Sequence, residues 1–87
     1  LSIKELKANA ENILVTPNPS TNLVFLKNAN KDNFDFVELY DFNGRKIATN
    51  TELQNNTLDV SSFAKGLYFI VLKKDTITVK VLKCLVK

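Results

Sequence analysis

The feature that most constrains this chain is a regular alternation of short apolar runs and turn-forming clusters from residue 12 onwards. The runs are rich in Val, Ile, Leu, Phe, Tyr and Thr, and clusters of Asn, Asp, Gly and Ser separate them. Turn signals spaced about 8–12 residues apart predict an all-β fold, a small immunoglobulin-like β-sandwich of about seven antiparallel strands. The expected strands cover residues 12–16, 21–27, 35–41, 45–49, 53–60, 66–74 and 77–86.

The chain has 87 residues, which limits it to one domain with little room for a deep catalytic pocket. Because it begins with Leu1 rather than Met, we expect it to be part of a longer protein. We expect residues 1–11 to be a linker from an upstream domain, too short to hold a helix alone. Residues 12–87 then form the domain. No secretory signal peptide is present and no apolar run is long enough to span a bilayer, so we expect no membrane insertion.

The composition argues against catalysis. The chain has no His, which removes the usual general base and the commonest metal ligand. Cys84 is the single cysteine and lies in an apolar strand pattern, so we expect a buried small hydrophobe and no disulfide. No phosphate-binding loop or metal motif is present, and we expect no enzyme, no metal and no cofactor. A net charge of +3 is too mild to indicate nucleic-acid binding.

The segment "TPNPS" holds both prolines, Pro17 and Pro19, with Asn18 between them. Neither proline has an N–H to donate to a strand ladder, so a strand must stop here. Each proline also favours an extended conformation at the residue before it. We therefore predict that this segment crosses from one sheet of the sandwich to the other.

The segment "YDFNGRKI" allows two hairpin turns. A two-residue turn leaves Leu39 opposite Ala48. A three-residue loop with Gly44 in the left-handed conformation pairs Leu39 with Ile47 instead, and it lets the Asp41 carboxylate accept the N–H two residues later. We favour the second turn because it places Leu39 and Ile47 on one buried face.

A second corner lies in "LDVSSFAKGLYFIVL". Leu58 and Val60 end a strand on a common face, and Phe63 returns to the core after a tight turn. Gly66 permits the reversal into the next strand. Tyr68 then takes the place of the tyrosine that hydrogen-bonds back across a corner of immunoglobulin-like sandwiches, with a buried ring and a satisfied hydroxyl.

Taken together in this order, "VTPNPSTNLVFL", "VELYDFNGRKI" and "LDVSSFAKGLYFIVLKKDTITVKVLK" resemble the type A C-terminal sorting domain of the type IX secretion system of Bacteroidota. The resemblance covers residues 13–87. Thr16, Phe63 and Cys84 depart from the commonest residues of the pattern. The positions that match the family motif are Pro17, Asn18, Pro19, Asp41, Gly44, Arg45, Gly66, Tyr68 and Lys80.

The resemblance implies a non-catalytic signal that takes its parent through the periplasm and across the outer membrane, to the medium or the cell surface. The implied partners are the secretion machinery, a sortase-like peptidase that cuts within residues 1–12, and an upstream cargo domain. The alternative is an immunoglobulin-like surface or carbohydrate-binding module that stays on a secreted protein. We expect a monomer, although the apolar last strand would allow edge pairing between copies.

Most of the matching positions are expected to determine the fold rather than to contact a partner. The candidates for contact are cations whose side chains we expect to be exposed: Arg45, Lys80, Lys83 and Lys87. The segment Asp75-Thr76-Ile77 also resembles an O-glycosylation site of Bacteroidota, with Thr76 as the acceptor, although a plain turn is the simpler interpretation.

Overall fold

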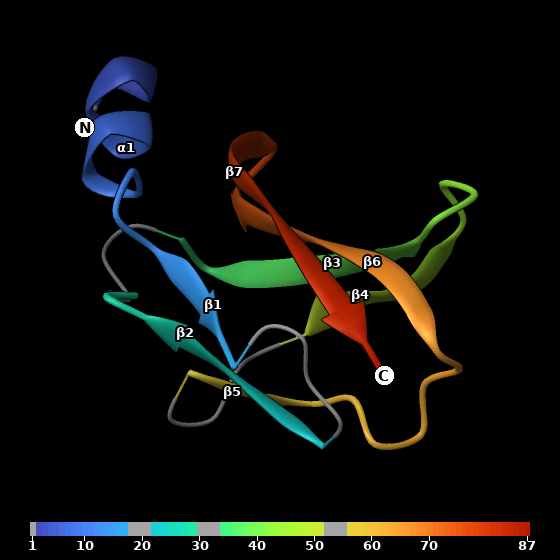
Figure 1. Cartoon of the computed structure of the whole chain (residues 1–87). Coiled ribbons are helices and arrows are strands. Elements are labelled where there is room, and N and C mark those ends of the chain that lie inside the picture. Colours follow the sequence, from blue (N-terminus) through green and yellow to red (C-terminus); the bar gives the residue numbers. More distant parts are fainter. Residues whose placement is uncertain (1, 18–21, 30–33, 52–55) are drawn as a thin grey trace.

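The computed structural model of the chain describes residues 2–17, 22–29, 34–51 and 56–87 (Figure 1). Within these residues, seven strands follow one short helix. The elements are α1 (Ile3–Asn9), β1 (Leu14–Thr16), β2 (Leu23–Lys27), β3 (Phe36–Asp41), β4 (Lys46–Thr51), β5 (Thr57–Asp59), β6 (Gly66–Lys74) and β7 (Ile77–Val86).

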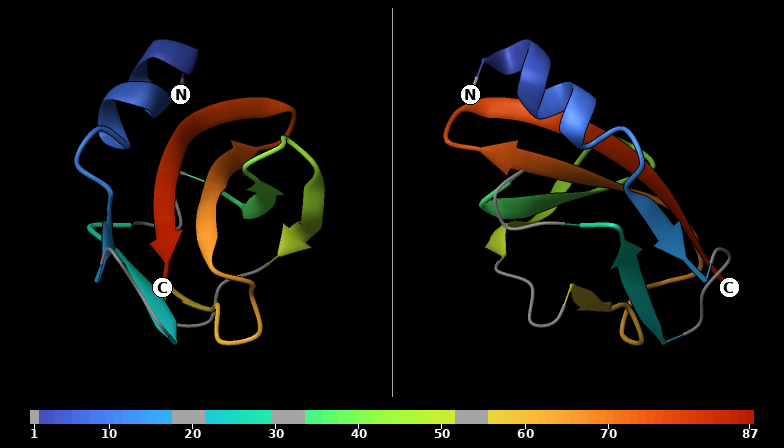
Figure 2. Two further views of the ribbon diagram at one scale, coloured as in Figure 1. Left: turned by 45° about the vertical axis from the view of Figure 1, so that its right-hand side comes forward. Right: turned by 90° about the vertical axis from the view of Figure 1, so that its left-hand side faces the viewer.

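The strands form two antiparallel sheets that face each other, which confirms the predicted small β-sandwich (Figure 2). One sheet has the order β1-β2-β5 and the other has the order β4-β3-β6-β7. β1 therefore lies at the same side of the sandwich as β7, with which it is in contact. β4 and β5 end the two sheets on the opposite side. None of the described helices is long and apolar enough to cross a membrane.

The core lies between the sheets and follows the alternation of side chains along each strand. On β2, for example, Val24 and Leu26 are buried while their neighbours on the strand are exposed. Cys84 is 1% exposed, and burial raises the pKa of its thiol, so the prediction of a buried small hydrophobe is confirmed. The largest fully buried side chains are Ile13, Val24, Leu26, Val37, Val60, Ile70, Leu72 and Cys84.

The N-terminal segment differs from the predicted linker, because residues Ile3–Asn9 form α1. Ser2 caps the helix: its Oγ accepts the N–H of Glu5 at 3.1 Å and donates to the Glu5 carboxylate at 3.0 Å. α1 also contacts β7, and Ala10, just past its end, is fully buried. A helix too short to persist alone is therefore held by a cap and by packing. That residues 1–11 link the domain to a cargo stays a prediction.

The prediction for the two prolines is wrong in one respect. β1 stops at Thr16, directly before Pro17, and the Thr16–Pro17 peptide bond is cis. However, β1 pairs with β2, with Val15 opposite Leu26, so the strands on either side of the two prolines belong to one sheet and not to two. Proline restricts individual backbone angles, and pairing of the flanking strands decides where the chain goes. Asn18 and Pro19 lie outside the described residues.

β7 is an edge strand of the larger sheet, as the prediction of edge pairing requires. On its outer face Val81 is 51% exposed and Leu85 is 38% exposed. That the chain is a monomer stays a prediction, with edge pairing between copies as the alternative.

Candidate docking site

The turn between β3 and β4 has the predicted three-residue loop. The N–H of Gly44 donates to the carbonyl of Asp41 at 3.0 Å, and the N–H of Asp41 donates to the carbonyl of Arg45 at 2.9 Å. Gly44 has φ +83°, in the left-handed region. The Asp41 carboxylate accepts the N–H of Asn43 at 3.0 Å. These contacts confirm the predicted turn chemistry.

The predicted register of this hairpin is wrong. Leu39 lies opposite Ala48, and Tyr40 lies opposite Lys46, so β4 has one extra residue, Ile47, between these two pairs. Such a bulge shifts the side chains of one strand relative to its partner. Ile47 is 43% exposed, whereas the prediction has it buried beside Leu39. The loop has three residues, as in the favoured alternative, but Leu39 lies opposite Ala48, as in the two-residue alternative.

Asp41 organises the turn and positions Arg45. Its Oδ1 also accepts the backbone N–H of Arg45 at 2.9 Å, and its Oδ2 accepts the Arg45 Nε–H at 2.9 Å. The backbone hydrogen bond from Arg45, followed by its side-chain bond, lowers the pKa of Asp41 below the ordinary 3.8. The Arg45 side chain is nevertheless 79% exposed. One edge of its guanidinium is tied to the turn while the side chain projects into solvent.

The corner before β6 has the predicted tyrosine arrangement. The Tyr68 hydroxyl donates to the carbonyl of Ala64 at 2.6 Å, and the residue is only 9% exposed. Its ring lies 5.0 Å from that of Phe63 between centroids, at 44°. The N–H of Phe63 donates to the carbonyl of Val60 at 3.0 Å, and Gly66 has φ +148° where the chain enters β6. The buried ring and satisfied hydroxyl of Tyr68 are confirmed.

Asp59 supports the predicted tight turn before Phe63 through contacts that were not predicted. Its Oδ1 accepts the hydroxyl of Ser61 at 2.6 Å and the N–H of Ser61 at 2.9 Å. The hydroxyl bond first, and then the backbone bond, lowers the pKa of Asp59 below its ordinary 3.8. An Asp two residues before a Ser at a strand end is a signal for such a turn and would have identified it.

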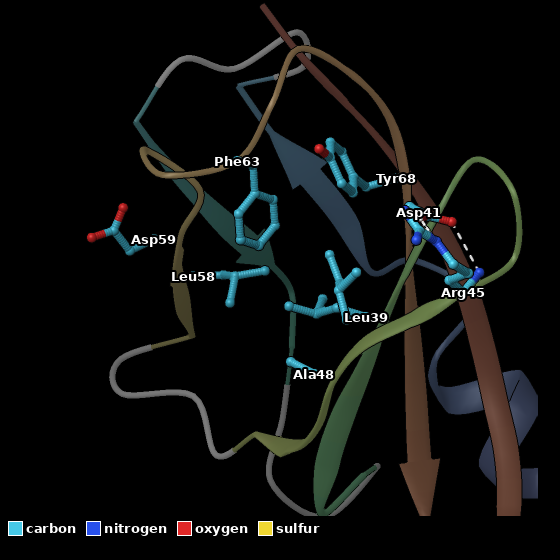
Figure 3. Close-up of a pocket in the computed structure, with 9 residues that line it drawn as sticks. Leu39, Asp41, Arg45, Ala48, Leu58, Asp59, Phe63 and Tyr68 are labelled. Atoms are coloured by element: carbon cyan, nitrogen blue, oxygen red, sulfur yellow. Dashed lines mark hydrogen bonds and ion pairs between the residues drawn. The ribbon is translucent and has the colours of Figure 1, made fainter.

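The two corners face each other across a cavity of about 470 Å³ between β4 and β5 (Figure 3). Apolar side chains and the Tyr68 ring form most of its wall, and Asp41, Arg45 and Asp59 contribute charged groups. Motif positions that lie far apart in the sequence are thus brought to one place. The lining residues are Leu39, Asp41, Arg45, Ile47, Ala48, Leu58, Asp59, Phe63 and Tyr68.

This cavity can accept an apolar side chain, with hydrogen-bonding groups at its wall to orient the main chain of a partner. The two carboxylates already accept hydrogen bonds within their own turns. Among the described residues, no group of three His, Cys, Asp or Glu side chains could hold a metal ion. The apolar wall of the cavity, with charged groups beside it, is suited to binding.

The other predicted contact residues do not join this cavity. Lys80 is only partly exposed, because its Nζ donates to the carbonyls of Glu11 at 2.5 Å and Ile13 at 3.2 Å. The expectation of an exposed Lys80 side chain is therefore wrong: backbone carbonyls beyond the end of α1 attract it. Lys83 and Lys87 are exposed, and Thr76 is exposed in the turn between β6 and β7. Pro17 is exposed at the end of β1.

A two-sheet sandwich whose sequence motifs build turns around a surface cavity defines a small β-sandwich domain with a candidate binding site. The family comparison makes this class specific. The chain belongs to the family of secretion system C-terminal sorting domains, whose model matches residues 14–87. It is thus a C-terminal sorting signal of type IX secretion, which leads proteins across the outer membrane to the surface or the medium. The comparisons with curated proteins and with solved structures gave no match.

Proposed function

We propose that this domain carries an upstream cargo to the outer membrane, where it docks on the type IX machinery without catalysing a reaction itself. A sortase-like peptidase then removes the domain, and the cargo is released or attached to the surface. Membership in the sorting-domain family supports the route. The observation that carries the docking step is the convergence of Asp41, Arg45 and Tyr68, all positions of the family motif, on one surface cavity.

Arg45 is the centre of the proposed docking site. Its Nε–H is held by Asp41, which reduces the freedom that binding would have to remove. Its side chain is 79% exposed beside an apolar cavity, an arrangement in which Arg is favoured at protein interfaces. Lys83 and Lys87 remain secondary contact candidates on the opposite edge. Lys80 is no longer among the leading candidates, because its ammonium group is engaged within the chain.

A binding module retained on the mature protein is the second candidate function. Phe42, at the tip of the β3–β4 turn, is 71% exposed, and an exposed aromatic side chain is what a sugar-binding surface requires. The variant Phe42→Ala separates the two functions. It should leave secretion unchanged if the domain is a sorting signal alone, and it should reduce ligand binding if the domain is a binding module.

The test is secretion of a reporter with its own export signal, fused to the N-terminal side of residues 1–87, in a Bacteroidota host with and without a working type IX system. We expect secretion only with the working system. Arg45→Glu should reduce it by about tenfold or more, since an inverted charge at an interface costs several kcal/mol. Lys27→Glu, which makes the same charge change at an exposed position of β2, is the matched control. Normal secretion of a folded Arg45→Glu reporter would contradict docking at Arg45.

A further inference from the structure

The segment between α1 and β1 is held to the sandwich through three successive carbonyl groups. Lys80 on β7 donates to the carbonyls of Glu11 and Ile13. Asn28, just after β2, donates its Nδ2–H to the carbonyl of Asn12 at 2.9 Å. We call this set of side-chain contacts to residues 11–13 the clasp. It joins a segment before the first strand to the last strand and to the smaller sheet.

Two buried side chains, at the start and the end of residues 10–13, also hold this segment to the sandwich. Ala10 and Ile13 are each 0% exposed and belong to the core. Releasing residues 10–13 from the sandwich would expose both side chains and would break hydrogen bonds from a charged donor. α1 lies outside the core: it contacts β7, but Ile3 is 53% exposed and the helix has only seven residues. Figure 2 shows α1 projecting beyond the sandwich.

We propose that the clasp is a proteolytic boundary. A peptidase acting on the folded chain cuts the peptide bond after Asn9, or a bond closer to the N-terminus, and leaves Ala10–Ile13 attached to the sandwich. A peptidase needs backbone that can leave its native hydrogen bonds. A short helix opens locally at low cost, whereas opening of the clasp exposes core residues. The boundary is a property of the chain, and its use in removing a sorting domain rests on the proposed function.

Limited proteolysis of the folded chain tests the boundary. The protease is proteinase K, which has broad specificity, and mass spectrometry identifies each new N-terminus over time. We expect early cuts within residues 2–9 and a persistent product that starts no later than Ala10. Cuts between Ala10 and Leu14 that form as fast as cuts within α1 would overturn the proposal.

Two variants open the clasp independently. Lys80→Met removes the ammonium group and keeps an apolar stem. Asn28→Gly removes the amide at a residue with φ +66°, which glycine adopts without strain. Each variant should increase the rate of cutting between Ala10 and Leu14 by about tenfold, equivalent to about 1.4 kcal/mol, if opening is fast relative to cleavage. Lys83→Met, an exposed lysine on the same strand, is the control and should cut like the wild type.

Circular dichroism establishes that each variant is folded. If Lys80→Met does not fold, Asn28→Gly decides the question. A folded variant with the wild-type cutting pattern would overturn the clasp. Because the experiment uses purified chain, its result is separate from the secretion assay: loss of the boundary leaves the sorting role untouched, and failure of secretion leaves the boundary in place.

Discussion

At the β4–β5 edge of the sandwich, Arg45 stands beside an open cavity with its side chain 79% exposed. At the β1–β7 edge, Lys80 reaches to the carbonyls of Glu11 and Ile13. Both are cations at positions of the family motif, yet the Arg45 side chain is largely exposed and the Lys80 ammonium group is engaged within the chain. Arg45 has a carboxylate at one side of its guanidinium and solvent around the rest. The Lys80 ammonium group donates to two backbone carbonyls that follow the end of α1. The exposure of a motif cation therefore depends on which acceptors the neighbouring edge offers.

The largest expected effect lies at the cavity edge. Tyr68→Ala should lower the free energy of unfolding by about 3–5 kcal/mol, because it removes a buried ring that packs on Phe63. Tyr68→Phe keeps the ring and loses the bond to the Ala64 carbonyl, so about 1 kcal/mol is expected. Urea denaturation measures both. Equal stability of Tyr68→Ala and the wild type would show that the cavity wall does not depend on this corner.

Lys80→Met and Arg45→Met test the comparison directly. Lys80→Met should lower the free energy of unfolding by about 1.5–3 kcal/mol, the range for hydrogen bonds that involve a charged group. Arg45→Met should change it much less, because an exposed ion pair contributes little. Urea denaturation of the two variants under one set of conditions gives the difference. If Arg45→Met proved the more destabilising, the assignment of one cation to binding and the other to structure would be reversed.

Gly44→Val should destabilise the chain by about 1–3 kcal/mol, because a β-branched residue would have to adopt φ +83°. Open space surrounds the position of the added Cβ, so the cost comes from the backbone rather than from a clash. Gly44→Asn, which tolerates this conformation better, should cost less. Thermal melts compare the three chains. An unchanged melting temperature for Gly44→Val would contradict the turn at Asp41–Arg45.

The smallest expected effect is the pH dependence that arises from Asp41. Its pKa is lowered on folding, so its carboxylate stabilises the fold fully above the unfolded value of about 3.8. This contribution is lost as the pH falls through the lower folded value. Asp41→Asn should therefore melt slightly below the wild type at neutral pH, and the gap should narrow below about pH 3.8. Asp75→Asn, at the distant β6–β7 turn, is the control. A gap independent of pH would contradict this role.

Prediction from sequence succeeded where a few adjacent residues determine the outcome. The left-handed Gly44, the Asp41 turn and the bond from Tyr68 to Ala64 each involve residues within five positions of one another. Prediction failed where distant segments compete. The exposure of Ile47 follows from a bulge against β3, and α1 persists because it packs against β7, far away in the sequence. The residues around Ile47 do not indicate the bulge against β3, and those of α1 do not indicate the contact with β7.

The amino-acid sequence by itself determined the strand pattern, the class of fold and the chemistry of the turns, because side-chain alternation and backbone preference act over short distances. Only the tertiary structure decided which motif positions line the cavity. It also decided which cation binds backbone carbonyls at the β1–β7 edge. Asp41 and Tyr68 meet because β3 pairs with β6 in register. Lys80 reaches residues 11–13 because contact between β1 and β7 brings the start and the end of the domain together.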